Sequence, residues 1–587
     1  MFRTTIIITV AILGISVAAF PLRSGDVRVG DLKTAGSVYS YHASMAAEGD
    51  SVYAVWVSET GQGQNGVNFS SSTDGGRSWN QTLTIISDTP PLKGNVFLHP
   101  VIAADGSNLL AAWEVHHGGS TSIHASLSLD GGQTWMKDHT GQVSYFGSAK
   151  SQSRSLCAAV GGQQFYVVST LNLKGSQQRS RIYLHRSTDA GTTWISHQMD
   201  SSDINQEYDA LRPDIAVRDD TVFIAWEDTF DQGNHKEHIR YNVSTDGGLT
   251  WLWQDDGQLD SGPPANTYHA MDPSIAVDDT CLYAAWFDNR NGDDSILMNR
   301  STDWGQTWMN VDRFVSTGSN CSTGSNRFVE IVTSGTHVYA VWRYAGSSFA
   351  DLANKEICFN LSTDNGATWG SSAVRLDADE APGCAGLEIP VLTALDDDVY
   401  VAWNSMALGN SDIWLQHSAD RGQTWLPAPV RRDMGDCDGH SHSLRPMIVS
   451  LSDRALLAWM DAREGHPDLY ARSVPDDDPQ IEISPSQINQ GDMASFTLTG
   501  TPSQAYEVYY SYEGSSFTNT PPVILDLLNP IQMIPPPGPG TFDPTGIATG
   551  TFTIPAPGTG QAPYLFRCQA VDVASGRVSN VFRITVE

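Results

Sequence analysis

The chain has 587 residues and carries 66 acidic residues against 34 basic ones, which gives a formal net charge of −32. Its length exceeds what one ordinary hydrophobic core accommodates, so we expect several domains or one large repeat array. A surface this acidic repels phosphate backbones, which argues against a nucleic-acid partner.

The first residues have the pattern of a secretory signal peptide. A basic residue, Arg3, precedes an apolar run to about Val17, and Ala18 and Ala19 offer a small-residue cleavage site. The run is shorter than a membrane span. We therefore predict a signal peptide over residues 1–19 and a secreted mature protein, extracellular or periplasmic, without a membrane span. An uncleaved anchor is the alternative.

A repeated phrase, Ser-x-Asp-x-Gly-x-x-Trp, dominates the rest of the chain, and we call it the box. It occurs seven times, and its aspartates lie 56 to 61 residues apart. These aspartates are Asp74, Asp130, Asp189, Asp246, Asp303, Asp364 and Asp420. Upstream of each box an apolar strand ends in Trp or its equivalent, as in SVYAVW to Trp56. There are eight such strands, one more than the boxes.

One unit contains four short strands with alternating or apolar patterns, and helical periodicity is almost absent. Units of four strands repeating every 50–60 residues predict a β-propeller. We favour eight blades, with seven as the alternative, and place the propeller at residues 20–475. The last unit lacks a box, and we expect VRVGDLK (27–33) to supply its missing fourth strand and close the ring.

The composition changes after residues 476–479, where the boxes end. Two stretches of alternating strands flank a loop with the sequence PPPGPG at 535–540. About 110 residues of this kind are typical of an immunoglobulin-like β-sandwich. We place this C-terminal domain at 480–587.

Each box is expected to be the hairpin turn between the third and fourth strands of a blade. Asp side chains accept hydrogen bonds from nearby backbone N–H groups, and Gly adopts the positive φ that such turns need. The Trp is expected to return to the apolar interior. Because equivalent turns are spread around a ring, their aspartates cannot converge on one substrate. The box is therefore structural.

These boxes resemble the Asp-box (BNR) repeats of the sialidase-like propellers, and the resemblance covers about residues 35–475. It implies a glycoside hydrolase of the exo-sialidase type, with three arginines on the substrate carboxylate, a Tyr–Glu nucleophile pair and an Asp acid/base. The family's first arginine lies in an Arg-Ile-Pro phrase. This sequence has no such phrase, and LEIP (387–390) has Glu388 in the place of the arginine. No catalytic residue is carried over from the family.

The position of a site follows from the propeller geometry, because ligands of propellers bind near the central channel where the innermost strands begin. A recurring proline marks those strands in five units. The residues directly before the proline position are His42, His99, Ser155, Arg212, Asp272, Phe328, Ile389 and Arg445. Four arginines lie at this position or one residue earlier: Arg154, Arg212, Arg327 and Arg445. Their guanidinium groups suit a carboxylate or sulfate.

We therefore predict an acidic-glycan site at the channel mouth, bound by these four arginines and His99. Glu388, Asp272, Tyr268 and Tyr208 are the candidates for proton transfer or nucleophilic attack. The alternative for the arginines is structural ion pairing with carboxylates such as Asp272 or Glu388. The alternative for the whole protein is a non-catalytic propeller that binds a glycan or a protein.

Two loops on the same side carry Asp-x-Arg, in WFDNRNGDD (286–294) and WMDAREG (459–465). They are predicted to clamp their own loops, with ligand contact as the alternative. The span Asp288 to Asp294 lacks EF-hand spacing, and His440 and His442 lack zinc-site spacing, so no metal or other cofactor is predicted.

The seven cysteines show no C-x-x-C spacing. We predict buried thiols at Cys157 and Cys281 and a disulfide between Cys384 and Cys437.

Overall fold

The structure is a computed structural model of the chain, and the contacts between its Cα atoms divide it into two compact units, one at Gly25–Asp477 and one containing Asp478–Glu587. In the first unit it describes residues 26–29, 38–60, 65–80, 84–87, 96–117, 120–136, 142–146, 156–173, 179–200, 209–229, 236–253, 256–261, 268–318, 325–345, 355–377, 390–406, 410–433, 442–463 and 465–474. In the second unit it describes the backbone of strands only. Every regular element in the described residues is a β-strand.

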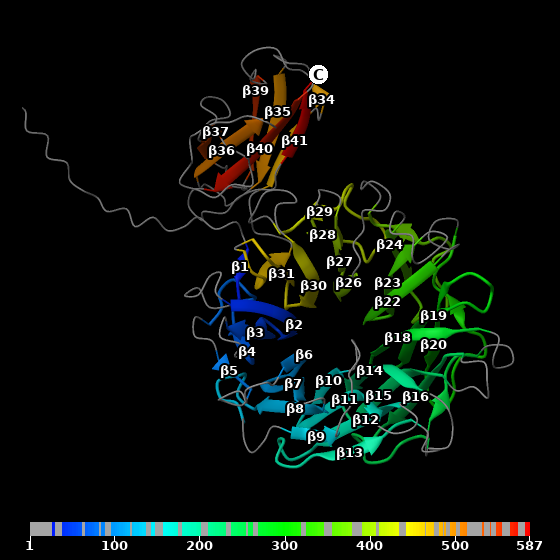
Figure 1. Cartoon of the computed structure of the whole chain (residues 1–587). Coiled ribbons are helices and arrows are strands. Elements are labelled where there is room, and N and C mark those ends of the chain that lie inside the picture. The colour runs from blue at the N-terminus through cyan, green and yellow to red at the C-terminus, as the bar shows by residue number, and fades with distance from the viewer. Residues whose placement is uncertain are drawn as a thin grey trace, which may run out of the picture. The chain divides into compact units, whose positions relative to one another are not determined.

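The first unit is a β-propeller of eight four-stranded blades arranged in a ring (Figure 1). Blade 1 contains β2 (Val38–Glu48), β3 (Ser51–Thr60), β4 (Asn65–Ser72) and β5 (Thr84–Ile85). Blade 2 contains β6 (Val96–Asp105), β7 (Asn108–His117), β8 (Ser120–Ser128) and β9 (Gln142–Phe146). Blade 3 contains β10 (Leu156–Gly161), β11 (Gln164–Leu173), β12 (Arg179–Ser187) and β13 (Ile195–Gln198). Blade 4 contains β14 (Ala210–Arg218), β15 (Thr221–Asp228), β16 (His238–Ser244) and β17 (Gly257–Gln258).

Blade 5 contains β18 (Ala270–Val277), β19 (Leu282–Asp288), β20 (Ser295–Ser301) and β21 (Arg313–Phe314). Blade 6 contains β22 (Ser325–Ser334), β23 (His337–Ala345), β24 (Lys355–Ser362) and β25 (Val374–Arg375). Blade 7 contains β26 (Val391–Leu395), β27 (Asp398–Ser405), β28 (Asp412–Ser418) and β29 (Val430–Arg431). Blade 8 contains β30 (Ser443–Ser450), β31 (Ala455–Asp461), β32 (Asp468–Val474) and β1 (Val27–Arg28).

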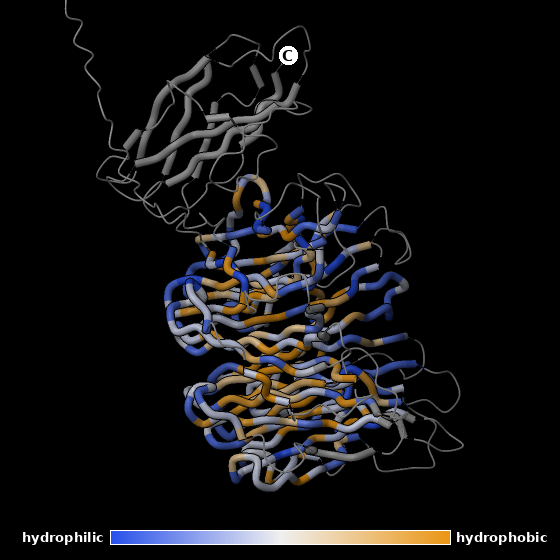
Figure 2. Tube along the Cα trace, turned by 60° about the vertical axis from the view of Figure 1, so that its left-hand side comes forward, coloured by the Kyte–Doolittle hydropathy of each residue, from blue (hydrophilic) through white to orange (hydrophobic). Residues whose placement is uncertain are grey.

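The first strand of each blade lies next to the first strands of both neighbouring blades, so these eight strands surround the central channel. The second strands are apolar on both sides because each blade is packed between two others. Their terminal tryptophans are buried, as in Trp226, Trp286 and Trp459, which are 0% exposed. Figure 2 shows hydrophobic stretches within the strands of this unit.

The hydrophobic core of the propeller consists of eight clusters, one between each pair of neighbouring blades. The cluster between blades 8 and 1 joins the two ends of the repeat array. It contains Val29 beside β1, Trp56 of blade 1 and Ala458 of blade 8. Because all eight junctions are filled in the same way, the ring is closed.

The predicted closure by the N-terminal strand is confirmed. Val27 and Arg28 of β1 pair antiparallel with Ala471 and Tyr470 of β32. The Val29 amide donates to the Leu469 carbonyl at 2.8 Å. The closing strand therefore completes blade 8 and covers its outer edge, which would otherwise expose unpaired backbone groups.

The boxes are hairpin turns between third and fourth strands, as expected, and their hydrogen bonds repeat from blade to blade. In blade 4 the Thr250 amide donates to Asp246 Oδ1 at 2.8 Å, and the Thr250 hydroxyl donates to Asp246 Oδ2 at 2.6 Å. The Ser244 hydroxyl donates to Asp246 and accepts from the Gly248 amide. Gly248 has a φ of 82°, which a side chain would strain. The aspartate thus fixes its own turn.

The box tryptophans are less buried than the sequence suggested. Trp79 is 5% exposed, but Trp251 is only partly buried and packs against the edge of a core cluster. The reason is position, because the box lies at the rim of the blade rather than between two blades.

The second unit contains two sheets. One has the strand order β33 (Gln480–Ser484), β35 (Met493–Thr499), β39 (Ile547–Thr553). The other has the order β34 (Gln487–Ile488), β41 (Phe582–Val586), β40 (Tyr564–Asp572), β36 (Ala505–Tyr512), β37 (Ile531–Gln532), with β38 (Gly540–Thr541) also pairing with β36. An immunoglobulin-like sandwich stays a prediction for this unit.

Some predictions concern residues outside those that the structure describes. They include the signal peptide at 1–19 and the Cys384–Cys437 disulfide. Cys281 is a buried thiol, as predicted. The same prediction is wrong for Cys157, which is partly exposed and donates from its thiol to the Pro213 carbonyl. Within the described part of the chain, no helix has the length and apolarity needed to cross a membrane.

Candidate functional site

Within the described residues, six innermost strands carry a β-bulge at the same point, close to where the strand begins. The register shifts there by one or more residues against the second strand of the blade. The residue at each bulge has a φ between 48° and 57° although none is glycine. These residues, which we call the bulge ring, are His42, His99, Arg212, Asp272, Phe328 and Arg445. They are the described members of the set that the proline register selected from the sequence.

Neighbouring members of the bulge ring contact one another across blade boundaries. Arg445 of blade 8 donates from Nη1 to Nδ1 of His42 in blade 1 at 2.6 Å. The His42 and His99 rings lie 4.6 Å apart, centroid to centroid, in an edge-on arrangement. In blades 4 and 5, Arg212 Nε lies 3.2 Å from Asp272 Oδ1. The bulges therefore gather side chains from different blades at one end of the channel, which we call the channel mouth.

A second layer of side chains supports the bulge ring from inside the blades. In blade 2, for example, Glu114 directly follows the buried Trp113 of the second strand. It pairs in register with Leu98, the residue before the bulge residue His99. In blade 2 the His99 imidazole lies 3.6 Å from Glu114, measured from Nδ1 to Oε2. In blade 4, Arg212 Nη1 lies 2.5 Å from Glu227 Oε1. In blade 6, Arg343 lies behind Phe328 in the same way. Three blades thus place a charged residue behind the bulge side chain.

The first cluster at the mouth comes from blades 8, 1 and 2. The side chain of Glu114 is only 1% exposed. Its Oε2 atom is hydrogen-bonded to His116 Nε2 at 3.1 Å and also faces His99 Nδ1. His99 and His116 are 24% and 29% exposed. Solvent therefore reaches the imidazoles but not the carboxylate behind them.

His42 is neutral in this cluster. Burial and the Arg445 guanidinium lower the pKa of His42 to about 4. Because arginine can only donate, Nδ1 of His42 is the acceptor and its proton is on Nε2. His42 therefore presents an N–H donor rather than a base.

The second cluster comes from blades 4 and 5 and is more completely paired. Arg212 lies between Glu227 and Asp272, which are 2% and 5% exposed, and the Asp272 amide donates to Glu227 Oε2 at 3.1 Å. Burial raises the pKa of Glu227 by more than Arg212 lowers it, so this pKa lies above the usual range. Although burial lowers the pKa of Arg212, these two carboxylates raise it overall. The alternative of structural ion pairing thus holds for this arginine, although its side chain stays 36% exposed.

Arg327 and Phe328 extend the second cluster into blade 6. The Arg327 guanidinium stacks over the Phe287 ring at 3.5 Å and lies 3.5 Å from Asp294. Burial lowers the pKa of Arg327, and Arg212 is near enough to lower it further. Arg343, which is 2% exposed, stacks over Phe328 at 4.6 Å. Arg212 and Arg327 therefore act on the same region of the mouth.

Arg212 also lines a cavity of about 340 Å³. Its walls come from the innermost strands of blades 3 to 6, and they include Cys157, Asp214, Ser274 and Glu330. A cavity of this size admits a group comparable with one sugar ring, at the lower end of the range for small-molecule sites.

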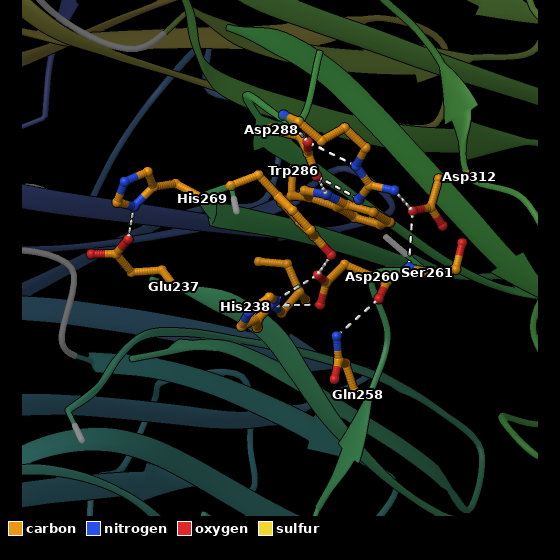
Figure 3. Close-up of polar contacts among 12 residues, drawn as sticks. Glu237, His238, Gln258, Asp260, Ser261, His269, Trp286, Asp288 and Asp312 are labelled. Atoms are coloured by element: carbon orange, nitrogen blue, oxygen red, sulfur yellow. Dashed lines mark hydrogen bonds and ion pairs between the residues drawn. The ribbon is translucent and has the colours of Figure 1, made fainter. Parts of the chain in front are cut away.

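Tyr268 is not placed for catalysis, contrary to the sequence prediction. It is 1% exposed and belongs to the core cluster between blades 4 and 5. Its hydroxyl donates to Asp260 Oδ2 at 2.7 Å, and the same oxygen lies 2.8 Å from His238 Nδ1. Figure 3 shows Asp260 beside His238 within this network. Burial and Asp260 raise the pKa of Tyr268, so the phenol stays protonated. The chain turns inward before β18, which the sequence pattern did not reveal.

The other candidates divide between residues of the bulge ring and residues that lie outside the described part. Glu388, Tyr208 and Arg154 belong to the latter. Asp272 and His99 are at the mouth.

The two Asp-x-Arg segments are loop clamps, as predicted. Arg290 donates to both oxygens of Asp288 and to Asp312 at 2.7 Å. Arg463 likewise bridges Asp461 and Asp26. Asp288 is therefore engaged by an arginine, and among the described residues no group of three or more His, Cys, Asp or Glu side chains is arranged to hold a metal ion.

The sequence reasoning missed Glu114, Glu227 and Arg343. A signal was available, because each is a charged residue directly after a buried strand position in an otherwise apolar run: WE, WE and WR. A charge at such a position needs a partner or an exposed end.

No protein-family model and no curated protein matches the chain. Among solved structures it is similar to an α-L-arabinanase of Penicillium chrysogenum, with 14% identity over 57% of this chain and 97% of that one, and a TM-score of 0.34. It is also similar to a Trypanosoma rangeli sialidase mutant displaying trans-sialidase activity, with 12% identity over 56% of this chain, 55% of that one and a TM-score of 0.33. An ulvan lyase of a new polysaccharide lyase family gives 10% identity over 69% of this chain, 98% of that one and a TM-score of 0.40.

Proposed function

We propose that the protein binds an acidic glycan at the channel mouth. The observation that carries this proposal is the bulge ring. A non-glycine residue in the left-handed region is strained by about 1–3 kcal/mol, and such strain concentrates at functional sites. A purely structural bulge would be least strained with glycine, yet all six described positions hold large side chains, five of them polar or charged. The side chain is therefore what each position provides.

The charge at the mouth favours an anionic ligand. Arg445, Arg212 and Arg327 stand on one opening of a protein whose net charge is −32. A local group of guanidinium groups in an acidic surround attracts carboxylate or sulfate to that opening and repels it elsewhere. The imidazole pair His42 and His99 and the Tyr41 ring beside His42 supply flat surfaces on which a sugar ring can lie.

A hydrolase of the exo-sialidase type is the finer form of this proposal that the sequence resemblance favours. It requires a tyrosine–glutamate pair at the ligand, and Tyr268 is committed to Asp260 in the core. Tyr208 and Glu388 remain candidates for that pair. Secretion, proposed from the N-terminal pattern, agrees with an extracellular polysaccharide or glycoconjugate as the ligand.

The proposal is tested by binding to immobilised glycans that carry sialic acid, uronic acid, sulfate or no charge. We expect binding to acidic glycans only, and we expect Arg445→Ala to weaken it at least tenfold. Arg454→Ala is the matched control, because Arg454 lies at the other end of the same blade and pairs with the exposed Asp453. Equal binding of neutral and acidic glycans, or equal losses in the two variants, would contradict the proposal.

A further inference from the structure

The first cluster at the mouth has a feature that ligand binding alone does not require, namely an imidazole held against a buried carboxylate. His99 Nδ1 is shielded from solvent and lies 3.6 Å from Glu114 Oε2. The side chain of His99 is nevertheless 24% exposed, so solvent reaches the part of the ring away from Nδ1.

This arrangement prepares His99 to accept a proton. The negative charge of Glu114, 3.6 Å from an Nδ1 that has no hydrogen-bond partner among the described residues, favours an N–H on that nitrogen, and this tautomer leaves the lone pair on Nε2. The same carboxylate stabilises the imidazolium that forms when Nε2 takes up a proton. His42, by contrast, is held by Arg445 as a donor. The two imidazoles, 4.6 Å apart, thus have different roles.

The arginine next to this pair suits a substrate carboxylate. Arg445 is exposed and lies beside His42, at the same opening as His99. A carboxylate bound by a guanidinium group carries less negative charge on its carbon framework, which makes the adjacent C–H more acidic. Hydrolysis by two carboxylates has less support here, since Glu227 and Asp272 both hold Arg212.

We propose that His99, positioned by Glu114, removes the proton next to the carboxylate of a uronic acid residue bound at Arg445, so that the glycan is cleaved by β-elimination. The C5–H bond breaks and its proton goes to Nε2 of His99. The electron pair forms a C4=C5 double bond as the C4–O glycosidic bond breaks. The leaving oxygen takes up a proton from solvent or from the imidazolium, so neither water nor an oxidant is consumed. This inference rests on the proposed binding of acidic glycans.

The experiment incubates the full chain with polygalacturonate and with a glucuronate-containing polysaccharide, and follows the ultraviolet absorbance of the conjugated double bond. His99→Asn is the informative variant, because Asn tolerates the left-handed conformation that His99 adopts at φ 48°. We expect it to lower kcat at least about 100-fold, with a much smaller loss of glycan affinity from the missing ring surface. His197→Ala, on the exposed fourth strand of blade 3, is the control and is expected to keep the wild-type rate.

Glu114 is a positioning residue in this scheme, and a double-mutant cycle tests it. Glu114→Gln alone is expected to lower kcat, and the His99→Asn/Glu114→Gln variant is expected to be no slower than His99→Asn. A merely structural Glu114 would give additive losses.

The outcomes separate the two proposals. Binding of a uronic acid glycan without unsaturated product would overturn the elimination chemistry and leave the binding function intact. Absence of binding to any acidic glycan would overturn both. Full activity in His99→Asn would remove His99 from the reaction.

Discussion

Closure of the ring depends on Asp26, and the substitution Asp26→Ala tests how much that contact contributes. The carboxylate precedes β1 and is 1% exposed, with Arg463 Nη1 at 2.7 Å and Arg472 Nη1 at 3.2 Å. Both arginines belong to blade 8 and are almost buried, at 9% and 3% exposure. Removing Asp26 therefore leaves two buried cations with less compensation.

The size of the expected loss in unfolding free energy depends on which carboxylate partners Arg463 and Arg472 retain without Asp26. Removing one partner of a buried ion pair costs about 3–5 kcal/mol. Arg463 retains Asp461, and burial already raises the pKa of Asp26, so part of the attraction is offset. We therefore expect a loss near the lower end, about 3 kcal/mol. Asp26→Asn keeps the volume and an acceptor and should lose less.

Urea unfolding followed by tryptophan fluorescence measures this loss in the propeller alone, because all 17 tryptophans precede residue 460. Asp453→Ala is the control, since Asp453 is 60% exposed in its pair with Arg454 and should contribute about 0–1 kcal/mol. If Asp26→Ala unfolded at the same urea concentration as Asp453→Ala, the closing strand would not stabilise the ring as we argue.

Three further predictions use the same protein. Trp226→Ala, at a fully buried site, should lower the free energy of unfolding in urea by about 3–5 kcal/mol. Trp251→Ala should lower it clearly less because the Trp251 ring is partly exposed, and equal losses would contradict this. Asp246→Ala should cost about 1 kcal/mol through lost turn hydrogen bonds. Burial raises the pKa of Asp246, but the hydrogen bonds from Thr250 and Ser244 bring it down to about 2. The stabilisation by these bonds is therefore fully present above the unfolded pKa near 4, and it should vanish as the pH falls to about 2. The His42 imidazole, with a pKa of about 4, should remain neutral in NMR titrations at pH 6; a midpoint near 6.5 would refute its contact with Arg445.

The fold was predictable because its determinants are local and repeated. Each blade carries its own apolar second strand, and seven of the eight also carry a box, so eight copies of the strand pattern in the sequence give eight blades. The missing fourth strand in the last unit pointed directly to the N-terminal residues, and β1 pairs there with β32.

The site was predictable only in outline. The proline register identified His42, His99, Arg212 and Arg445 as neighbours of the channel, because the bulge recurs at one position in the repeat. The partners of these residues were only partly predictable. The charge directly after a buried tryptophan signals that Glu227 needs a partner, but the strand pairing that brings it to Arg212 is not encoded in that local pattern. Tyr268 shows the opposite error, because its sequence position is close to the mouth but its side chain turns into the core.

The most direct test of the central claim is a crystal structure of the protein with a bound uronic acid or sialic acid oligosaccharide. We predict that the sugar carboxylate lies within hydrogen-bonding distance of Arg445, Arg212 or Arg327 at the channel mouth. A sugar bound instead at the other end of the channel, in the hollow lined by Asp105, Gly162 and Asp219, would contradict the account.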